Sequence, residues 1–149
     1  TTEADILGGQ RTDSEQILKM IQNPQAVILL SYLNHDENMK NERRLIGCCF
    51  LENIADARTA YFGMFAIDPK IQALGIGKKM IEHAEQFVRN QWGARFMEMT
   101  VITLRQELID WYERRGYEFT GEMREFPGDP AFGIQLRDGI VLGVWRKAL

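Results

Sequence analysis

The spacing of apolar residues changes from a strand pattern to a helix pattern in the middle of this 149-residue chain. Residues 59–67 are rich in aromatic and β-branched side chains, and the run ends at Asp68-Pro69, as a strand does. From Gly77 to Trp92-Gly93 the apolar residues recur three or four positions apart, which is the spacing of an amphipathic helix. They are Met80, Ile81, Ala84, Phe87 and Val88. A strand, a short loop and a long helix restrict the chain to folds that combine strands and helices.

The remaining segments extend this pattern to the order αβββαβαββ. Two further helices are predicted, at residues 13–23 (capped by Asp13 or Ser14) and 106–115. The other strands are predicted at 25–33, 45–51, 95–103, 117–123 and 140–145. Residues 34–43 read as a charged hairpin loop between the first two of these strands. We therefore expect an α/β fold with a mixed central sheet, formed as one domain over residues 1–149.

Composition excludes several classes of protein. The chain is 45% hydrophobic, which is enough to fill a core and rules out disorder. Its longest apolar run, at 26–30, is strand-sized, so no membrane-spanning helix is expected. The formal net charge of −3 argues against a nucleic-acid partner. Cys48 and Cys49 are adjacent in an apolar run and no targeting peptide is visible, so we expect a reducing, cytoplasmic location.

The loop between the strand and the long helix has the features of an anion-binding site. Gly75 and Gly77 lack the Cβ atoms that would keep a pyrophosphate away from the N–H groups at the helix start. The lysines at 78–79 add positive charge. A tight turn that binds nothing is the alternative. The loop is neither a Walker A loop nor a dinucleotide fingerprint, because Gln72 and Met80 stand where these motifs need glycine.

Two blocks of sequence resemble the GNAT superfamily of N-acetyltransferases. The first is Gln72-x-x-Gly75-x-Gly77, which follows a strand ending in Ile67-x-Pro69 and is similar to the family's acetyl-CoA pyrophosphate loop. The second is residues 105–117, where Tyr112 is followed after three spacers by Gly116-Tyr117, as in the family's helix after the fifth strand. A match of both blocks in the right order of elements is more specific than either block alone.

The resemblance covers residues 13–149, is strongest over 61–121, and implies the GNAT acyl-CoA N-acyltransferase fold. The predicted order lacks the strand and helix with which family members usually begin. We expect either that the chain is an N-terminally shortened fragment or that something else completes the sheet edge. Residues 25–33 would then lie at or near an edge with unpaired backbone groups, where a homodimer could form.

The resemblance implies direct transfer of an acetyl group from acetyl-CoA, a co-substrate, to a primary amine of a small molecule or peptide. Tyr112 stands where, in many members, a hydroxyl lies beside the CoA sulfur, so it is the expected donor of a proton to the leaving thiolate. A tyrosine buried in the core is the alternative. The residues expected to bind the donor are Phe65, Ala66, Ile67, Gln72, Ala73, Gly75, Ile76, Gly77, Lys78 and Tyr112.

Glu98 is the candidate general base, because it is a carboxylate in the otherwise apolar strand at 95–99. If it faces inward, burial would raise its pKa towards the range in which a general base works. If it faces outward, it is an ordinary solvated residue. A chain of water molecules could serve instead. Arg105 stands where many members have Asn, and it could approach a phosphate. No histidine has a partner at ligand spacing, so no metal is expected. Transfer of a longer acyl group and CoA binding without catalysis remain alternative functions.

Overall fold

The computed structural model describes residues 3–34, 43–72 and 74–149, which form two compact units. One unit consists of residues 23–97 with Leu149, and the other of Thr1–Gln22 with Glu98–Ala148. Residues 35–42 of the predicted hairpin loop and Ala73 of the predicted donor-binding loop lie outside the described residues. No helix in the described ranges is long and apolar enough to cross a membrane.

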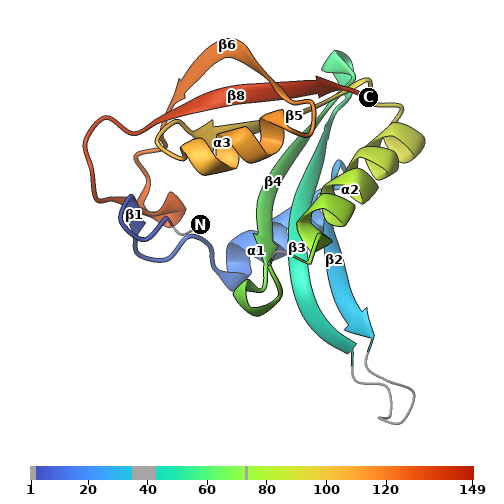
Figure 1. Ribbon diagram of the computed structural model, residues 1–149, viewed down its shortest axis with the longest axis horizontal. Coiled ribbons are helices and arrows are strands. Elements are labelled where there is room, and N and C mark those ends of the chain that lie inside the picture. The colour runs from blue at the N-terminus through green and yellow to red at the C-terminus, as the bar shows by residue number, and fades with distance from the viewer. Residues whose placement is uncertain (1–2, 35–42, 73) are drawn as a thin grey trace. The chain divides into compact units, whose positions relative to one another are not determined.

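The first unit is an antiparallel sheet of three strands with a long helix packed on it (Figure 1). Its elements are β2 (Ala26–Asn34), β3 (Arg43–Ile54), η1 (Ala55–Ala57), β4 (Thr59–Ile67), η2 (Pro69–Ile71) and α2 (Ile76–Trp92). The helix contacts β3 and β4, and its buried residues are Met80, Ile81, Ala84 and Val88. These four belong to the set that the helical spacing predicted. Gly93 ends the helix in a left-handed conformation, with φ +62°.

A bulge near the end of β4 determines which backbone groups of the following residues face β3; these residues include those expected to bind the donor. The β3–β4 register shifts between Cys48 and Phe50, so β4 has one more residue than β3 over this stretch. Met64 lies in the bulge with φ +47°, which is uncommon for a residue with a side chain. The Cys48 thiol donates to the Met64 carbonyl at 3.6 Å.

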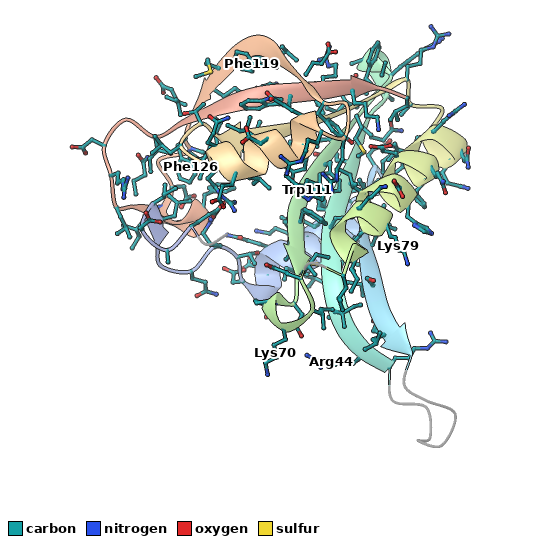
Figure 2. All side chains as sticks on the ribbon, in the orientation of Figure 1. Arg44, Lys70, Lys79, Trp111, Phe119 and Phe126 are labelled. Carbon is teal, nitrogen blue, oxygen red and sulfur yellow. The ribbon has the colours of Figure 1, made fainter. Side chains whose placement is uncertain are left out.

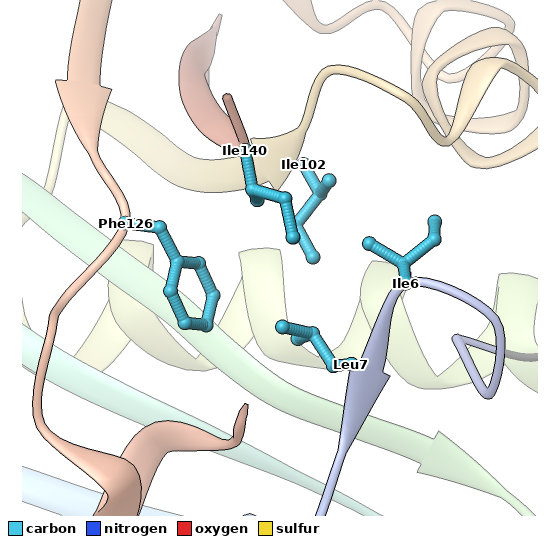
Figure 3. Packing of buried hydrophobic residues seen from close by; sticks show 5 residues of the cluster. All are labelled: Ile6, Leu7, Ile102, Phe126 and Ile140. Carbon is cyan, nitrogen blue, oxygen red and sulfur yellow. The ribbon is translucent and has the colours of Figure 1, made fainter. Parts of the chain in front are cut away.

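The second unit contains a sheet with the hydrogen-bonded order β5-β8-β6 and a separate two-stranded sheet of β1 and β7. Its elements are β1 (Leu7–Gly8), α1 (Ser14–Gln22), most of β5 (Phe96–Ile102), α3 (Gln106–Glu113), β6 (Glu118–Glu125), η3 (Pro130–Phe132), β7 (Ile134–Gln135) and β8 (Val141–Ala148). Between Phe119 and Met123, β6 bows away from β8 because the register shifts there (Figure 1). A core cluster of Ile6, Leu7, Ile102, Phe126 and Ile140 joins β1 to the end of β5 (Figure 3).

The predicted order αβββαβαββ is confirmed, with the short strands β1 and β7 and three 3-10 turns added. Asp13 rather than Ser14 caps α1, because Asp13 Oδ1 accepts the Gln16 N–H at 2.8 Å. Among the described strands of its unit, β2 pairs with β3 alone, as expected for an edge strand. The strand near the N-terminus, β1, pairs with β7.

Candidate active site

The backbone at the end of β4 presents hydrogen-bonding groups that face away from β3. The Asp68 N–H donates to the Ile46 carbonyl at 2.8 Å, which marks a hydrogen-bonded position of the antiparallel ladder. These positions alternate, so the N–H and C=O groups of Phe65 and Ile67 point to the opposite side. The Ile67 carbonyl accepts a hydrogen bond from Gln72 Nε2 at 3.1 Å.

Ala66 differs from its two neighbours. It pairs with Cys48, so its backbone groups face β3, and its side chain is exposed. Of the three strand residues expected to bind the donor, Phe65 and Ile67 therefore direct their backbone groups away from β3, whereas Ala66 exposes its small side chain.

The turn after β4 is held by Asp68. One carboxylate oxygen of Asp68 accepts the Lys70 N–H at 2.9 Å, and the other forms an ion pair with Arg44. The Lys70 N–H and then the Arg44 guanidinium hold the pKa of Asp68 below its ordinary value. The carboxylate therefore stays charged and continues to cap the turn at neutral pH. Figure 2 shows Arg44 and Lys70 at this end of β4.

The N-terminus of α2 is open to a ligand. Gly75 caps it with φ +74°, and a Cβ built there would have no atom within 4 Å. The Lys79 N–H donates to the Gly75 carbonyl at 3.1 Å, so the N–H groups of Ile76, Gly77 and Lys78 come before this first helical bond and have no acceptor in the helix. Three such donors at the positive end of a helix fit a phosphate or pyrophosphate.

The lysines at the loop are exposed and able to move. Lys78 Nζ lies 3.9 Å from Glu82 Oε1, a solvent-exposed pair that contributes little to stability. Lys79 is exposed on the first turn of α2 (Figure 2). Both can therefore approach an anion bound at the helix start.

Tyr112 is buried on α3, in the second unit, among other aromatic residues. Its ring packs edge-to-face against Trp111 at 5.2 Å and Tyr117 at 5.9 Å between ring centroids. The Arg115 guanidinium lies over the ring of Trp111, with its Cζ atom 3.4 Å from the ring centroid. This packing fixes the ring of Tyr112, which suits both a core aromatic and a rigidly held proton donor.

Glu98 is buried on β5 and paired with two arginines. Arg146 Nε and Nη2 donate to Glu98 Oε2 at 3.1 and 2.7 Å, and Arg124 Nη2 lies 3.7 Å from Oε1. The side chain therefore faces inward, as the first of the two alternatives has it, and two arginines neutralise its charge. Of the two carboxylate oxygens, Oε1 has the longer contact. No sequence pattern indicated these partners, because they lie on β8 and β6.

The described residues show no activated nucleophile at the cysteines. Cys49 is fully buried and Cys48 half-buried. Burial raises the pKa of both thiols, that of Cys49 to about 12 with a further contribution from Cys48. Among the described residues, no group of three or more His, Cys, Asp or Glu side chains could hold a metal ion.

The family model of the acetyltransferase (GNAT) family matches residues 7–117 of this chain. The chain therefore belongs to this family, as the two sequence blocks predicted, and is an acetyltransferase of the acyl-CoA-dependent type. No curated protein matches the chain in sequence.

Solved structures of similar fold include three acetyltransferases. A variant of the spermidine N-acetyltransferase SpeG from Vibrio cholerae is 18% identical, with a TM-score of 0.65 over 90% of this chain and 72% of its own. A Bacillus anthracis protein provisionally assigned as a streptothricin acetyltransferase, in complex with acetyl coenzyme A, is 19% identical (TM-score 0.66; 89% and 67%). A GNAT family acetyltransferase from Elizabethkingia anophelis with acetyl-CoA bound is 15% identical (TM-score 0.66; 100% and 92%). The predicted GNAT fold is confirmed.

Proposed function

We propose that this protein transfers an acetyl group from acetyl-CoA directly to a primary amine of a small molecule or peptide. The observation that carries the proposal is the helix start at Gly75, where the first N–H groups of α2 have no acceptor in the helix. Such donors suit a pyrophosphate, and the Phe65 and Ile67 backbone groups that face away from β3 suit an extended amide-containing arm, which together is the chemistry of CoA. The spermidine N-acetyltransferase of similar fold supports an amine as the acceptor.

The donor binds through backbone more than through side chains in this proposal. Phe65 and Ile67 pair with the pantetheine arm, and the loop from Gln72 to Lys78, including Ala73, binds the pyrophosphate. Gln72 also braces the loop, because its side chain ties it to the Ile67 carbonyl. Helix N–H groups and two lysines supply the positive field that a pyrophosphate needs.

The reaction forms one C–N bond and breaks one C–S bond. The amine, with a free pKa of about 10.4 if it resembles lysine, must lose a proton before it attacks the thioester carbonyl. The departing CoA thiolate takes up a proton, which the hydroxyl of Tyr112 supplies. Glu98, through Oε1, or a chain of water molecules accepts the proton of the amine.

Replacing Tyr112 with Phe tests this assignment, because the change keeps the packed ring and removes only the hydroxyl. We expect kcat to fall roughly 10²-fold, with little change in the KM for acetyl-CoA. The loss should shrink with an acyl donor whose thiol has a lower pKa, since that leaving group needs less help. Tyr117→Phe is the matched control: it removes a hydroxyl from the adjacent buried ring and should leave kcat at the parental value. A Tyr112→Phe variant with parental kcat would show that Tyr112 is a core residue.

The role of Glu98 is tested by comparing Glu98→Gln with Arg146→Gln. A general base at this position predicts that Glu98→Gln lowers kcat by roughly 10²-fold or more, whereas Arg146→Gln, which keeps the carboxylate, does not. If Glu98 only anchors β5 to β8, the two variants should lower the melting temperature alike and keep the parental kcat.

Two assays separate the alternative functions. Thiol release measured with acetyl-CoA and with longer acyl-CoA donors, on a mixed panel of amines, distinguishes acetyl transfer from transfer of a longer chain. Tight CoA binding without thiol release on any amine would instead favour a non-catalytic binding module. We further propose that the chain acts as one domain in the cytoplasm and forms a homodimer through β2.

A further inference from the structure

An ion pair holds the N-terminal residues of the chain to the start of α3. Arg105, the residue directly before α3, donates through Nη1 to Glu3 Oε1 at 2.6 Å. The other oxygen of Glu3 pairs with Arg11. The Arg105 side chain is 15% exposed and that of Glu3 is 26% exposed, so water screens this contact less than it does an ordinary surface pair.

The segment around Glu3 is itself firmly anchored in the second unit. The Glu3 carbonyl accepts the N–H groups of Ile6 and Leu7, both at 2.8 Å. This turn directs Ile6 and Leu7 into the cluster that contains Ile102, near the end of β5 (Figure 3). The backbone of Glu3 is therefore held by hydrogen bonds in this turn, and its carboxylate meets Arg105.

Arg105 is in turn part of the first turn of α3. Its N–H donates to the Ile102 carbonyl at 2.9 Å, and its own carbonyl accepts the N–H groups of Leu108 and Ile109 at 3.1 and 3.0 Å. The backbone of Arg105 thus connects the end of β5 to the start of the helix that carries Tyr112. The Arg105 side chain forms no capping hydrogen bond at this helix start, and its guanidinium contacts Glu3.

We infer that Glu3 is a positioning residue for acetyl transfer. By binding Arg105 it fixes the start of α3, and through the helix it fixes the position of Tyr112 on α3. This inference rests on the proposed role of Tyr112 as proton donor. Catalysis is sensitive to such support, because a displacement of about 1 Å can cost roughly 10²-fold in rate.

Glu3→Gln tests the inference with little change of volume. We expect kcat to fall about tenfold, with the KM for acetyl-CoA unchanged and the protein folded. Asp5→Asn is the matched control, because Asp5 belongs to the same segment and its ion pair with Arg137, at 3.1 Å, is solvent-exposed and does not involve α3. The control should keep parental kcat. A folded Glu3→Gln variant with parental kcat would overturn the inference.

A double-mutant cycle with Tyr112→Phe separates positioning from general loss of structure. If Glu3 acts through the Tyr112 hydroxyl, adding Glu3→Gln to Tyr112→Phe should cause little further loss of kcat. An equal loss in both backgrounds would contradict the inference and leave the role of Tyr112 intact. If Tyr112→Phe alone has no effect, the proposed role of Tyr112 fails, and the inference fails with it.

Arg105→Gln removes the other partner of the same ion pair, and it replaces Glu3→Gln as the test variant if Glu3→Gln does not fold. It should reproduce the loss of kcat and again leave the KM for acetyl-CoA unchanged. A raised KM for acetyl-CoA in this variant would mean that Arg105 contacts the donor directly, and the inference would be wrong.

Discussion

Replacing Gly75 with Ala should separate the role of the loop in donor binding from its role in folding. Gly75 has φ +74°, a conformation that residues with a Cβ rarely adopt. Among the described residues, apart from the two chain neighbours, a Cβ there would meet no atom within 4 Å, so the substitution causes backbone strain without a clash with them. The new methyl group would instead enter the open space at the helix start, where we propose that the CoA pyrophosphate binds.

The two effects have different sizes. Left-handed backbone costs a non-glycine residue about 1–2 kcal/mol, which for a domain of this length lowers the melting temperature by about 2–8 °C. Loss of one hydrogen bond to a charged phosphate oxygen costs about 1.5–3 kcal/mol. The Kd for CoA should therefore rise by about 10- to 100-fold in a protein that remains folded.

Gly93 provides a matched control at the other end of the same helix. It has φ +62°, and a Cβ there would also have no atom within 4 Å. Gly93→Ala should lower the melting temperature as much as Gly75→Ala does, yet leave the Kd for CoA unchanged. Calorimetric titration and thermal unfolding of both variants measure the two quantities. Equal CoA affinity in the two variants would refute the assignment of the loop as the pyrophosphate site.

Other changes test neighbouring parts of the structure. Gly77→Val should abolish measurable CoA binding in calorimetry while circular dichroism stays that of the parent, because a branched Cβ would crowd the first turn of α2 where the anion binds. Stability should fall between pH 9 and pH 12, since the pKa of Cys49 is raised from 9.0 to about 12 and the unfolded thiol loses its proton first; unfolding of Cys49→Ala should lack this part of the loss. Sedimentation should show a dimer, and a proline in the middle of β2 should dissociate it; a parental chain that is monomeric at high concentration would exclude pairing through this edge.

The parts of the fold that could be predicted from the sequence depend on local chemistry. The bounds of α2 follow from the spacing of its buried residues and from the glycines at its two ends, where the backbone is left-handed. The loop after β4 could be found because Asp68-Pro69 ends the strand and the glycines open the helix start. These features need only residues that are close in sequence.

The parts that could not be predicted depend on pairings between distant residues. The bulge at Met64 arises from the register of β4 on β3, which neither strand specifies alone. The arginine that holds Glu98 lies on β8, 48 residues further along the chain. The contact between Glu3 and Arg105 spans 102 residues. The apolar strand around Glu98 suggests that this residue is buried. Its arginine partners could be identified only once the order of the strands was known.

Recognition by backbone and recognition by side chains depend on the sequence in different ways, which is why donor binding can be predicted from the sequence and the acceptor amine cannot. At the end of β4 and the start of α2 the proposed contacts to CoA are made by N–H and C=O groups, which every residue except proline provides in full. Only the glycines must be kept, because they leave room for the ligand and permit a left-handed turn at Gly75. An acceptor amine, by contrast, must be selected by side chains, which are free to differ between relatives. The amine panel thus tests the part of the function that belongs to this chain in particular.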